Sequence, residues 1–315
     1  MGSEVNTTRF TSLMTIRDFI TDCINRLSSL YPAAEAKAIA FRLLEHYTDI
    51  PSYKYIAEPD LVIPGTGPSV MPGVTPSVMP GLTGHLNPDG DSPLLAALDE
   101  MATGRPLQYV LGFTEFCGHR FKVGEGCLIP RPETEDLVSR IIDDLSGTEI
   151  GDEPFNILDM CTGSGCIAWS LAAEFPEAMV YGCDLSDAAL RYACRQRIKV
   201  GGAKPVFFAA DVLAAPPAGL PEFDVIVSNP PYICDSERAA MRPNVLDFEP
   251  AEALFVPDDD PMKFYRAIAR WADALLRPDG HIYLEINERF GPSVAALFPG
   301  SRILPDINGK DRFVI

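Results

Sequence analysis

The sequence predicts an α/β protein with a doubly wound, mostly parallel seven-stranded sheet, an antiparallel C-terminal hairpin and a small N-terminal helical domain. From residue 155 onward, short apolar segments typical of strands alternate with helical segments. This alternation is typical of a parallel sheet with helices on both faces. Only PDINGKD joins the last two strand segments. A parallel crossover needs about a dozen residues or more, so these two strands must be antiparallel.

Helical periodicity dominates the first hundred or so residues. Thr15 is placed to cap a helix, and Asp18 follows at the spacing of a capping box. A second helix is indicated from Pro32, which suits a first helical position, and a third over residues 93–101. We therefore expect residues 1–104 to form a helical domain.

A tandem repeat interrupts this domain at residues 64–84. PSVMPGVT is followed directly by PSVMPGLT. Pro and Gly every few residues exclude a helix and disfavour a central strand, and two copies are too few for a solenoid. We interpret the segment as an inserted Pro/Gly-rich loop.

Residues 105–130 are expected to connect the helical domain to the second domain, residues 131–315. Two extended segments around Cys117-Gly118 predict a β-hairpin. Pro132 can open the helix that follows, and the acidic residues after it suit a positive helix N-terminus.

The strands and helices of the second domain are assigned from segment length and apolar spacing. The expected strands are FNILDM, MVYGCD, PVFFAA, FDVIVSN, HIYLEI, SRILP and DRFVI. The expected helices cover residues 165–175, 186–200, 261–276 and about 290–297.

Composition limits the possible functions. The formal net charge of −18 disfavours a grip on a nucleic-acid backbone, which depends on Lys and Arg. No apolar run is long enough for a transmembrane helix, and the N-terminal residues lack the pattern of a secretory signal. The eight cysteines have no zinc-site spacing. We expect reduced thiols in a cytoplasmic protein, without a metal.

Small residues follow the first strand of the second domain. They form the loop Cys161-Thr162-Gly163-Ser164-Gly165, which permits a tight turn and close approach of a ligand. Gly163, Gly165 and Ala168 also match the dinucleotide pattern G-x-G-x-x-A. That pattern alone is a weak signal, because an ordinary strand-to-helix turn has the same composition.

Two acidic residues follow the next two strands. Asp184 can accept hydrogen bonds from both ribose hydroxyls of a nucleoside, and Asp211 can accept from an adenine amino group. The alternatives are a helix cap for Asp184, with Ser186 competing for that position, and a surface turn for Asp211.

Asn229-Pro230-Pro231-Tyr232 follows a buried strand, at the edge of the sheet where ligands bind. Pro231 restricts Pro230 to an extended conformation, which directs the Pro230 carbonyl outward as a fixed acceptor. Asn229 adds a second oxygen and Tyr232 a flat face. Two acceptors and a ring suit a planar group with an NH₂, such as an amide or a base amine.

With these motifs, the sequence resembles the class I S-adenosylmethionine-dependent methyltransferases that act on amino nitrogen, and more narrowly the release factor glutamine methyltransferases. The resemblance covers most of residues 100–315. Its motifs, in the order typical of the family, are GRPLQYVLGFTEFCGHRFKV, LIPRPETEDLV, LDMCTGSGCIA, FDVIVSNPPYI, FEPAEALF, FYRAI and NGKDRFV.

The resemblance implies that S-adenosylmethionine is the cofactor, S-adenosylhomocysteine the product and a peptide chain release factor the substrate of a monomeric enzyme. It implies that residues 1–104 recognise the substrate. The implied catalytic and substrate-binding residues are Asn229, Pro230, Pro231 and Tyr232. The implied cofactor-binding residues are Asp159, Cys161, Thr162, Gly163, Ser164, Gly165, Asp184, Leu185, Asp211, Val212 and Asn229.

The chain departs from the family pattern at three places. Met160-Cys161 stands where the family has Leu-Gly, so a Cys occupies a glycine position in the cofactor loop. Residues 256–261 replace a Gly-rich stretch, and residues 64–84 lie outside the pattern.

Several activities remain open from the residues alone. The NH₂ acceptor site also suits a nucleic-acid amino-methyltransferase, which the net charge and the lack of a basic arm oppose. A ribosomal-protein glutamine methyltransferase is a closer alternative. An NAD-linked oxidoreductase would explain G-x-G-x-x-A, but not Asn229 to Tyr232 or the C-terminal hairpin. A non-catalytic module would follow if Cys161 abolished cofactor binding.

Overall fold

The structure is a computed structural model that describes residues 13–66, 92–146 and 154–315. Most of the predicted insertion, residues 67–84, lies outside these ranges. The chain forms two compact units, Met1–Leu111 and Gly112–Ile315. The β-hairpin that follows the first unit therefore belongs to the second.

The first unit is helical in its described part. Its helices are α1 (Ile16–Leu27), α2 (Ala33–Thr48), α3 (Lys54–Ala57), α4 (Pro93–Ala102) and α5 (Leu107–Leu111). The predicted capping box is present, because the Thr15 side chain accepts from the Asp18 N–H and the Asp18 carboxylate accepts from the Thr15 N–H. Pro32 precedes α2 in an extended conformation, so that helix begins one residue later than predicted.

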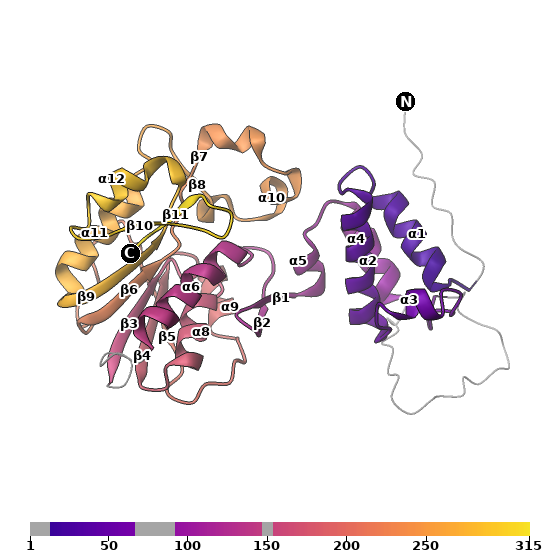
Figure 1. Cartoon of the computed structure of the whole chain (residues 1–315), viewed down its shortest axis with the longest axis horizontal. Coiled ribbons are helices and arrows are strands. Elements are labelled where there is room, and N and C mark those ends of the chain that lie inside the picture. The colour runs from indigo at the N-terminus through magenta and orange to yellow at the C-terminus, as the bar shows by residue number, and fades with distance from the viewer. Residues whose placement is uncertain (1–12, 67–91, 147–153) are drawn as a thin grey trace. The chain divides into compact units, whose positions relative to one another are not determined.

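The second unit contains the predicted seven-stranded sheet (Figure 1). Its strands are β3 (Phe155–Met160), β4 (Ala178–Asp184), β5 (Val206–Ala209), β6 (Phe223–Ser228), β9 (Leu276–Glu285), β10 (Ile303–Pro305) and β11 (Asp311–Val314). Their order is β10-β11-β9-β6-β3-β4-β5. The pairs from β5 to β9 are parallel, whereas β11 is antiparallel to both β9 and β10, which confirms the C-terminal hairpin.

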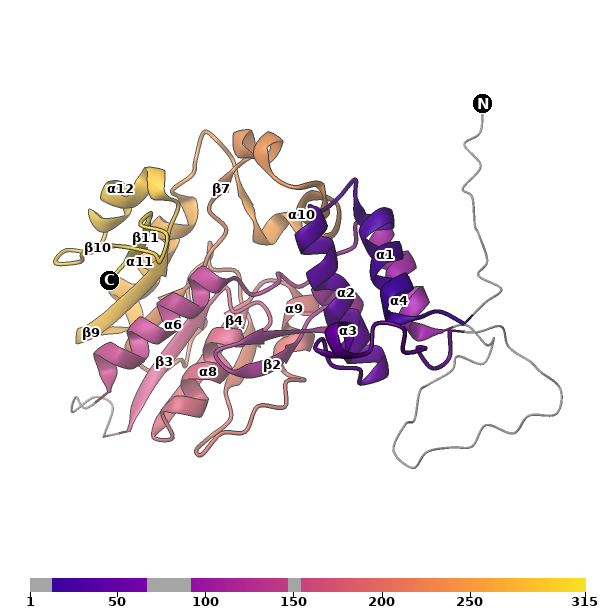
Figure 2. The ribbon, with the colours of Figure 1, turned by 45° about the vertical axis from the view of Figure 1, so that its right-hand side comes forward.

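Helices cover both faces of this sheet. On one face, α6 (Pro132–Leu145) and α8 (Cys166–Glu174) lie side by side and pack against Ile157 of β3 (Figure 2). On the other, α11 (Lys263–Leu275) and α12 (Gly291–Ala295) pack in a core that includes Leu158. Adjacent residues of β3 thus enter opposite cores, as expected for a strand buried on both faces.

The connector hairpin is formed by β1 (Phe113–Phe116) and β2 (His119–Lys122), with Phe116 paired to His119. The two turn residues, Cys117 and Gly118, have φ values of 46° and 71°. Positive φ at both central residues gives a turn whose twist matches that of the strands.

Two features of the second unit differ from the sequence prediction. The helix expected over residues 186–200 is α9 (Asp187–Ala193), which ends seven residues early. Between β6 and α11 the chain adds a two-stranded parallel sheet, β7 (Ile233–Cys234) with β8 (Phe255–Val256), and the helix α10 (Pro243–Phe248). These segments are too short to give a periodic pattern.

Among the described residues, no helix has the length and apolarity needed to cross a membrane. The eight cysteines are all unpaired, and most are buried. The free thiols agree with the expectation that the cysteines are reduced.

Thr15→Ala should lower the free energy of unfolding of the helical unit by about 1 kcal/mol, because one helix N–H loses its side-chain acceptor. Urea denaturation followed by circular dichroism measures the change. Thr21→Ala is the matched control, since the Thr21 hydroxyl only donates to the Arg17 carbonyl on the exposed side of the same helix. An equal loss in both variants would show that the cap contributes nothing.

Candidate active site

Three strands of the sheet end at the same level. Met160 of β3 lies opposite Cys183 of β4 on one side and Ser228 of β6 on the other. The Ser228 hydroxyl donates to the Met160 carbonyl at 2.7 Å, which ties two of these ends together. Because β4 and β6 lie on either side of β3, this is the point where the strand order reverses, and such points bind ligands.

The Gly-rich loop leaves β3 at this point and is fixed to its neighbour. The Thr162 N–H donates to the Cys183 carbonyl at 2.9 Å, and the Gly163 N–H donates to Asp184 Oδ2 at 2.8 Å. Gly163 and Gly165 have φ values of 56° and 78°, a region that favours glycine. The prediction that small residues turn the chain tightly here is confirmed.

Cys161 shares this left-handed conformation, with φ of 59°. It is the residue that stands where the family has glycine. A side chain in this region costs roughly 1–2 kcal/mol relative to glycine. The substitution therefore leaves the loop shape intact at the cost of local backbone strain.

Asp159 is fully buried beneath the loop. Its Oδ2 accepts from the Thr162 hydroxyl and from the Ala168 N–H at 3.1 Å, so it holds both ends of the turn into α8. Among the described residues, no donor reaches Asp159 Oδ1. Burial raises the pKa of this carboxyl to about 7.

The two predicted nucleoside acids differ in surroundings. Asp184 is half-buried, and its oxygens accept from the Gly163 and Ser186 N–H groups. Ser186, not Asp184, caps α9. Burial raises the pKa of the Asp184 carboxyl, and the backbone donors oppose the rise. Asp211 lies two residues past the end of β5. Its side chain is exposed and accepts from the Leu213 N–H at 2.9 Å.

Two apolar side chains, Leu185 and Val212, lie directly after the two acids at this edge of the sheet. Leu185 keeps 69% of its surface exposed, whereas Val212 is buried. An exposed leucine beside the loop offers an apolar face to a flat ring.

Asn229 to Tyr232 follow β6 directly, beside the Gly-rich loop. Among the described residues, no donor reaches Asn229 Oδ1 or the Pro230 carbonyl, so both acceptors remain available. A cavity of about 160 Å³ opens beside them. It is lined by Leu128, Arg131, Asn229, Pro230, Tyr232, Ile233, Met241, Val245, Ala253 and Leu254.

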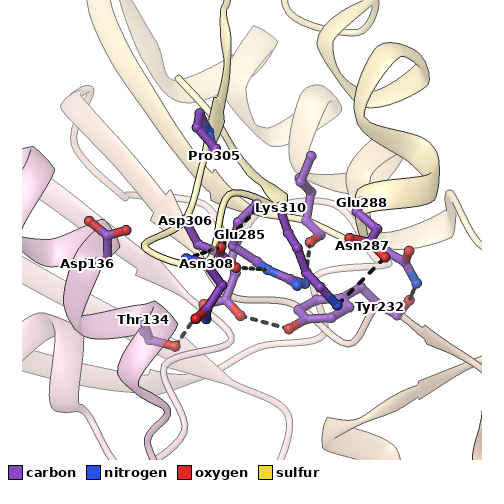
Figure 3. Close-up of polar contacts among 12 residues, drawn as sticks. Thr134, Asp136, Tyr232, Glu285, Asn287, Glu288, Pro305, Asp306, Asn308 and Lys310 are labelled. Atoms are coloured by element: carbon purple, nitrogen blue, oxygen red, sulfur yellow. Dashed lines mark hydrogen bonds and ion pairs between the residues drawn. The ribbon is translucent and has the colours of Figure 1, made fainter.

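Buried polar side chains support this segment from behind. Asn229 Nδ2 donates to the Thr134 hydroxyl oxygen at 3.0 Å, and the Thr134 hydroxyl donates to Glu285 Oε2 at 2.7 Å. The Tyr232 hydroxyl donates to Glu285 Oε1 at 2.8 Å. Figure 3 shows Thr134, Tyr232 and Glu285 pointing toward one another from three elements. Burial raises the pKa of the Glu285 carboxyl, while the two hydroxyl donors and Arg312 lower it.

A second buried carboxylate fixes the wall of the cavity. Glu249 accepts from Arg131 Nη2 at 2.7 Å and from the Ile129 N–H at 3.1 Å. Its side chain is only 1% exposed. This pair joins the segment before α6 to the segment after α10, two motifs that are far apart in the sequence.

The predicted site segments lie together at this edge of the sheet, but the sequence interpretation did not name the residues that support them. Thr134 lies in LIPRPETEDLV and Glu285 in HIYLEI, where each has the appearance of an ordinary helix or strand residue. Glu249 lies in FEPAEALF. For Thr134 and Glu249, the only signal was that their segments belong to the family motifs, whereas Glu285 lies in an expected strand outside those motifs.

The known proteins that this chain resembles are methyltransferases. The Methyltransferase small domain family matches residues 143–245. A release factor glutamine methyltransferase of Flavobacterium psychrophilum is 34% identical over 96% of this chain and 98% of that protein. One from Bacteroides thetaiotaomicron is 42% identical over 66% of this chain and 74% of that protein.

The chain belongs to the release factor glutamine methyltransferase family. Among solved structures, TrmN from Thermus thermophilus is 25% identical, with a TM-score of 0.38 over 55% of this chain and 47% of that chain. Membership of this family makes the chain a methyltransferase, its sheet has the strand order of a class I fold, and the cofactor that the family implies is S-adenosylmethionine.

The residues present fit this cofactor. A Cβ built on Gly163 would meet nothing within 4 Å, so the loop borders open space. The orphaned Asp159 Oδ1 and the exposed Leu185 lie along the same edge of the sheet. Among the described residues, no cluster of three or more His, Cys, Asp or Glu is arranged to hold a metal ion.

Gly163→Ala should weaken S-adenosylmethionine binding by about tenfold or more, near 1.4 kcal/mol, because the new methyl group enters the cofactor space. Isothermal titration calorimetry measures the affinity. Gly219→Ala is the matched control, because Gly219 also has positive φ and open space around its Cβ but lies before the opposite end of β6. Equal affinities in the two variants would place the cofactor elsewhere.

Proposed function

We propose that this enzyme transfers the methyl group of S-adenosylmethionine to the side-chain amide nitrogen of a glutamine in a peptide chain release factor. The observation that carries the proposal is the pair of free acceptors, Asn229 Oδ1 and the Pro230 carbonyl, beside the Gly-rich loop. An amide NH₂ has two hydrogens to donate, which matches two acceptors. The names of the relatives supply the release factor as the substrate.

The proposed chemistry needs orientation more than a strong base. The glutamine nitrogen is a poor nucleophile, because its lone pair is delocalised into the carbonyl group. Asn229 and Pro230 accept its two N–H hydrogens and thereby direct the lone pair out of the amide plane. When bound, S-adenosylmethionine supplies an electrophilic methyl carbon. Fixed dipoles that are already in place stabilise the charge that develops on the nitrogen at no cost in reorganisation. The new N–C bond replaces the S–C bond of the methyl donor, and the nitrogen releases one of its two hydrogens as a proton to solvent.

The other site residues have supporting roles in this proposal. Tyr232 borders the cavity and holds the plane of the substrate amide, with its own hydroxyl fixed by Glu285. The loop of residues 161–165, Asp184 and the Asp211-Val212 pair would hold the cofactor, with Asp184 accepting from the ribose hydroxyls and Asp211 from the adenine amino group.

The remaining assignments concern the whole protein. Residues 1–104 recognise the release factor, residues 105–130 connect, and residues 131–315 carry the transfer. The enzyme acts as a monomer in the cytoplasm, without direct contact with nucleic acid. The net charge of −18 supports a protein substrate over an RNA or DNA substrate.

Asn229→Ala should reduce kcat by about 100- to 1,000-fold, the usual cost of removing one fixed group that stabilises a transition state. Transfer of tritiated methyl groups from S-adenosylmethionine to purified release factor measures the rate. Circular dichroism establishes that the fold is retained. Near-normal turnover in this variant would refute the mechanism.

The same assay identifies the substrate. Release factor should incorporate one methyl group, and replacement of the acceptor glutamine by alanine should abolish incorporation. Ribosomal proteins and RNA are tested in parallel at equal concentration. Methylation of either, with release factor left unmodified, would overturn the proposed substrate while leaving the cofactor assignment intact.

A further inference from the structure

We propose that Glu285 is a positioning residue for methyl transfer, which acts through the Thr134 hydroxyl to turn the Asn229 amide so that Oδ1 faces the substrate. The inference rests on the proposed function and deepens it. It starts from a chain of contacts that joins a buried carboxylate to a catalytic amide. Asn229 Nδ2 lies 3.0 Å from Thr134 Oγ1, which lies 2.7 Å from Glu285 Oε2.

The direction of each hydrogen bond follows from the chemistry of the groups. An ionised carboxylate only accepts, and a threonine hydroxyl has one hydrogen to donate. The Thr134 hydrogen is therefore committed to Glu285, and only its lone pairs face Asn229. In the Asn229 amide, only the NH₂ group can donate to these lone pairs. Asn229 Oδ1 consequently points away from Thr134 and is left for the substrate.

Glu285 is held rigidly enough to fix this direction. The residue is 1% exposed, and its second oxygen accepts from the Tyr232 hydroxyl at 2.8 Å. Its backbone carbonyl accepts from Tyr265 of α11 at 3.4 Å. The carboxylate thus fixes two neighbouring catalytic side chains, Asn229 through Thr134 and Tyr232 directly.

The C-terminal hairpin supplies the positive charge behind this carboxylate. Arg312 of β11 donates to the Ile286 carbonyl at 3.2 Å and to Asp306 at 3.3 Å. The charged and titratable groups that face Glu285 are therefore Arg312 from β11, Tyr232 after β6, Tyr265 from α11 and Glu133 from α6.

Protonation of Glu285 should disturb the arrangement. Burial raises the pKa of this carboxyl above its ordinary value, so it gains a proton at a less acid pH than an exposed glutamate does. A protonated carboxyl can donate to Thr134, which frees the Thr134 hydrogen for Asn229. The Asn229 amide can then turn so that its Oδ1 accepts from the Thr134 hydroxyl instead of from the substrate. Turnover should fall as pH drops through the pKa of Glu285.

Thr134→Val tests the relay, because valine keeps the shape of threonine and removes the hydroxyl. The variant is assayed for kcat and KM with saturating cofactor over the pH range in which the fold is stable. We expect kcat to fall by about tenfold or more, less than on loss of Asn229 itself, and the acid limb of the pH profile to shrink to the part that acts through Tyr232. Thr134→Ser, which keeps the hydroxyl, should restore both kcat and the limb.

Ser139→Val is the matched control, since Ser139 is exposed on the same helix. It should leave the kcat profile unchanged. A Thr134→Val enzyme with wild-type kcat, or with a reduced kcat and an intact acid limb, would overturn the inference.

Tyr232→Phe is a second variant, which removes one hydrogen-bond donor to Glu285. Because that donor favours the charged form of the carboxyl, the acid limb should move to higher pH. An unmoved limb also contradicts the proposal.

An NMR measurement that needs no substrate distinguishes a failure of the hydrogen-bond relay from a failure of the proposed function. The side-chain NH₂ resonances of Asn229, followed by NMR with ¹⁵N labelling, should shift as Glu285 titrates in the wild type and should not shift in Thr134→Val. Absence of this titration in the wild type overturns the relay. Failure of the wild type to methylate release factor, with the titration present, overturns only the proposed function.

Discussion

The alignment of three neighbouring strand ends is the constraint on which the site depends. Met160 is paired with Cys183 on one side and Ser228 on the other, so the chain leaves the sheet at three adjacent points of equal height. The Gly-rich loop, Asp184 and Asn229 are the next residues along each strand. A register slip of one residue would reverse the facing of every side chain in the slipped strand, which the two apolar cores prevent.

Buried carboxylates then fix the orientation of the loops and side chains at these strand ends. Asp159 holds the turn into α8, Glu249 holds the wall of the cavity, and Glu285 holds Tyr232 and Thr134. Each lies where burial disfavours the charge, and hydrogen-bond donors compensate for it, from the same turn for Asp159 and from distant segments for Glu249 and Glu285. The site is therefore rigid because its support is polar and largely hydrogen-bonded, although among the described residues Asp159 Oδ1 and the Ser164 hydroxyl in the loop have no hydrogen-bond partner.

Much of the fold could be predicted from the sequence, because its determinants are local. The alternation after residue 155, the short connection PDINGKD and the capping box at Thr15 each specify their element within a few residues. The site segments were predictable for a similar reason, since a Gly-rich turn and a double proline impose their own backbone shape. The early end of α9 was missed, because apolar spacing continues past the residue where the helix ends.

The supporting contacts could not be predicted, because they join residues that are far apart in the chain. Thr134 and Glu285 are 151 residues apart, and Arg131 and Glu249 are 118 apart. No local pattern encodes such pairs. The left-handed conformation of Cys161 was hidden for a different reason, since only the tertiary position of the loop requires it.

The same long separations bear on how the enzyme comes to be active. Closing loops of this length is entropically expensive, so contacts of high sequence separation tend to form late in folding. Thr134 meets Asn229 and Glu285 only when α6, the end of β6 and the end of β9 are all in place. A partly folded chain with its sheet half built would have the loop motif but no oriented amide. Catalytic competence thus requires that α6, β6 and β9 are all in place.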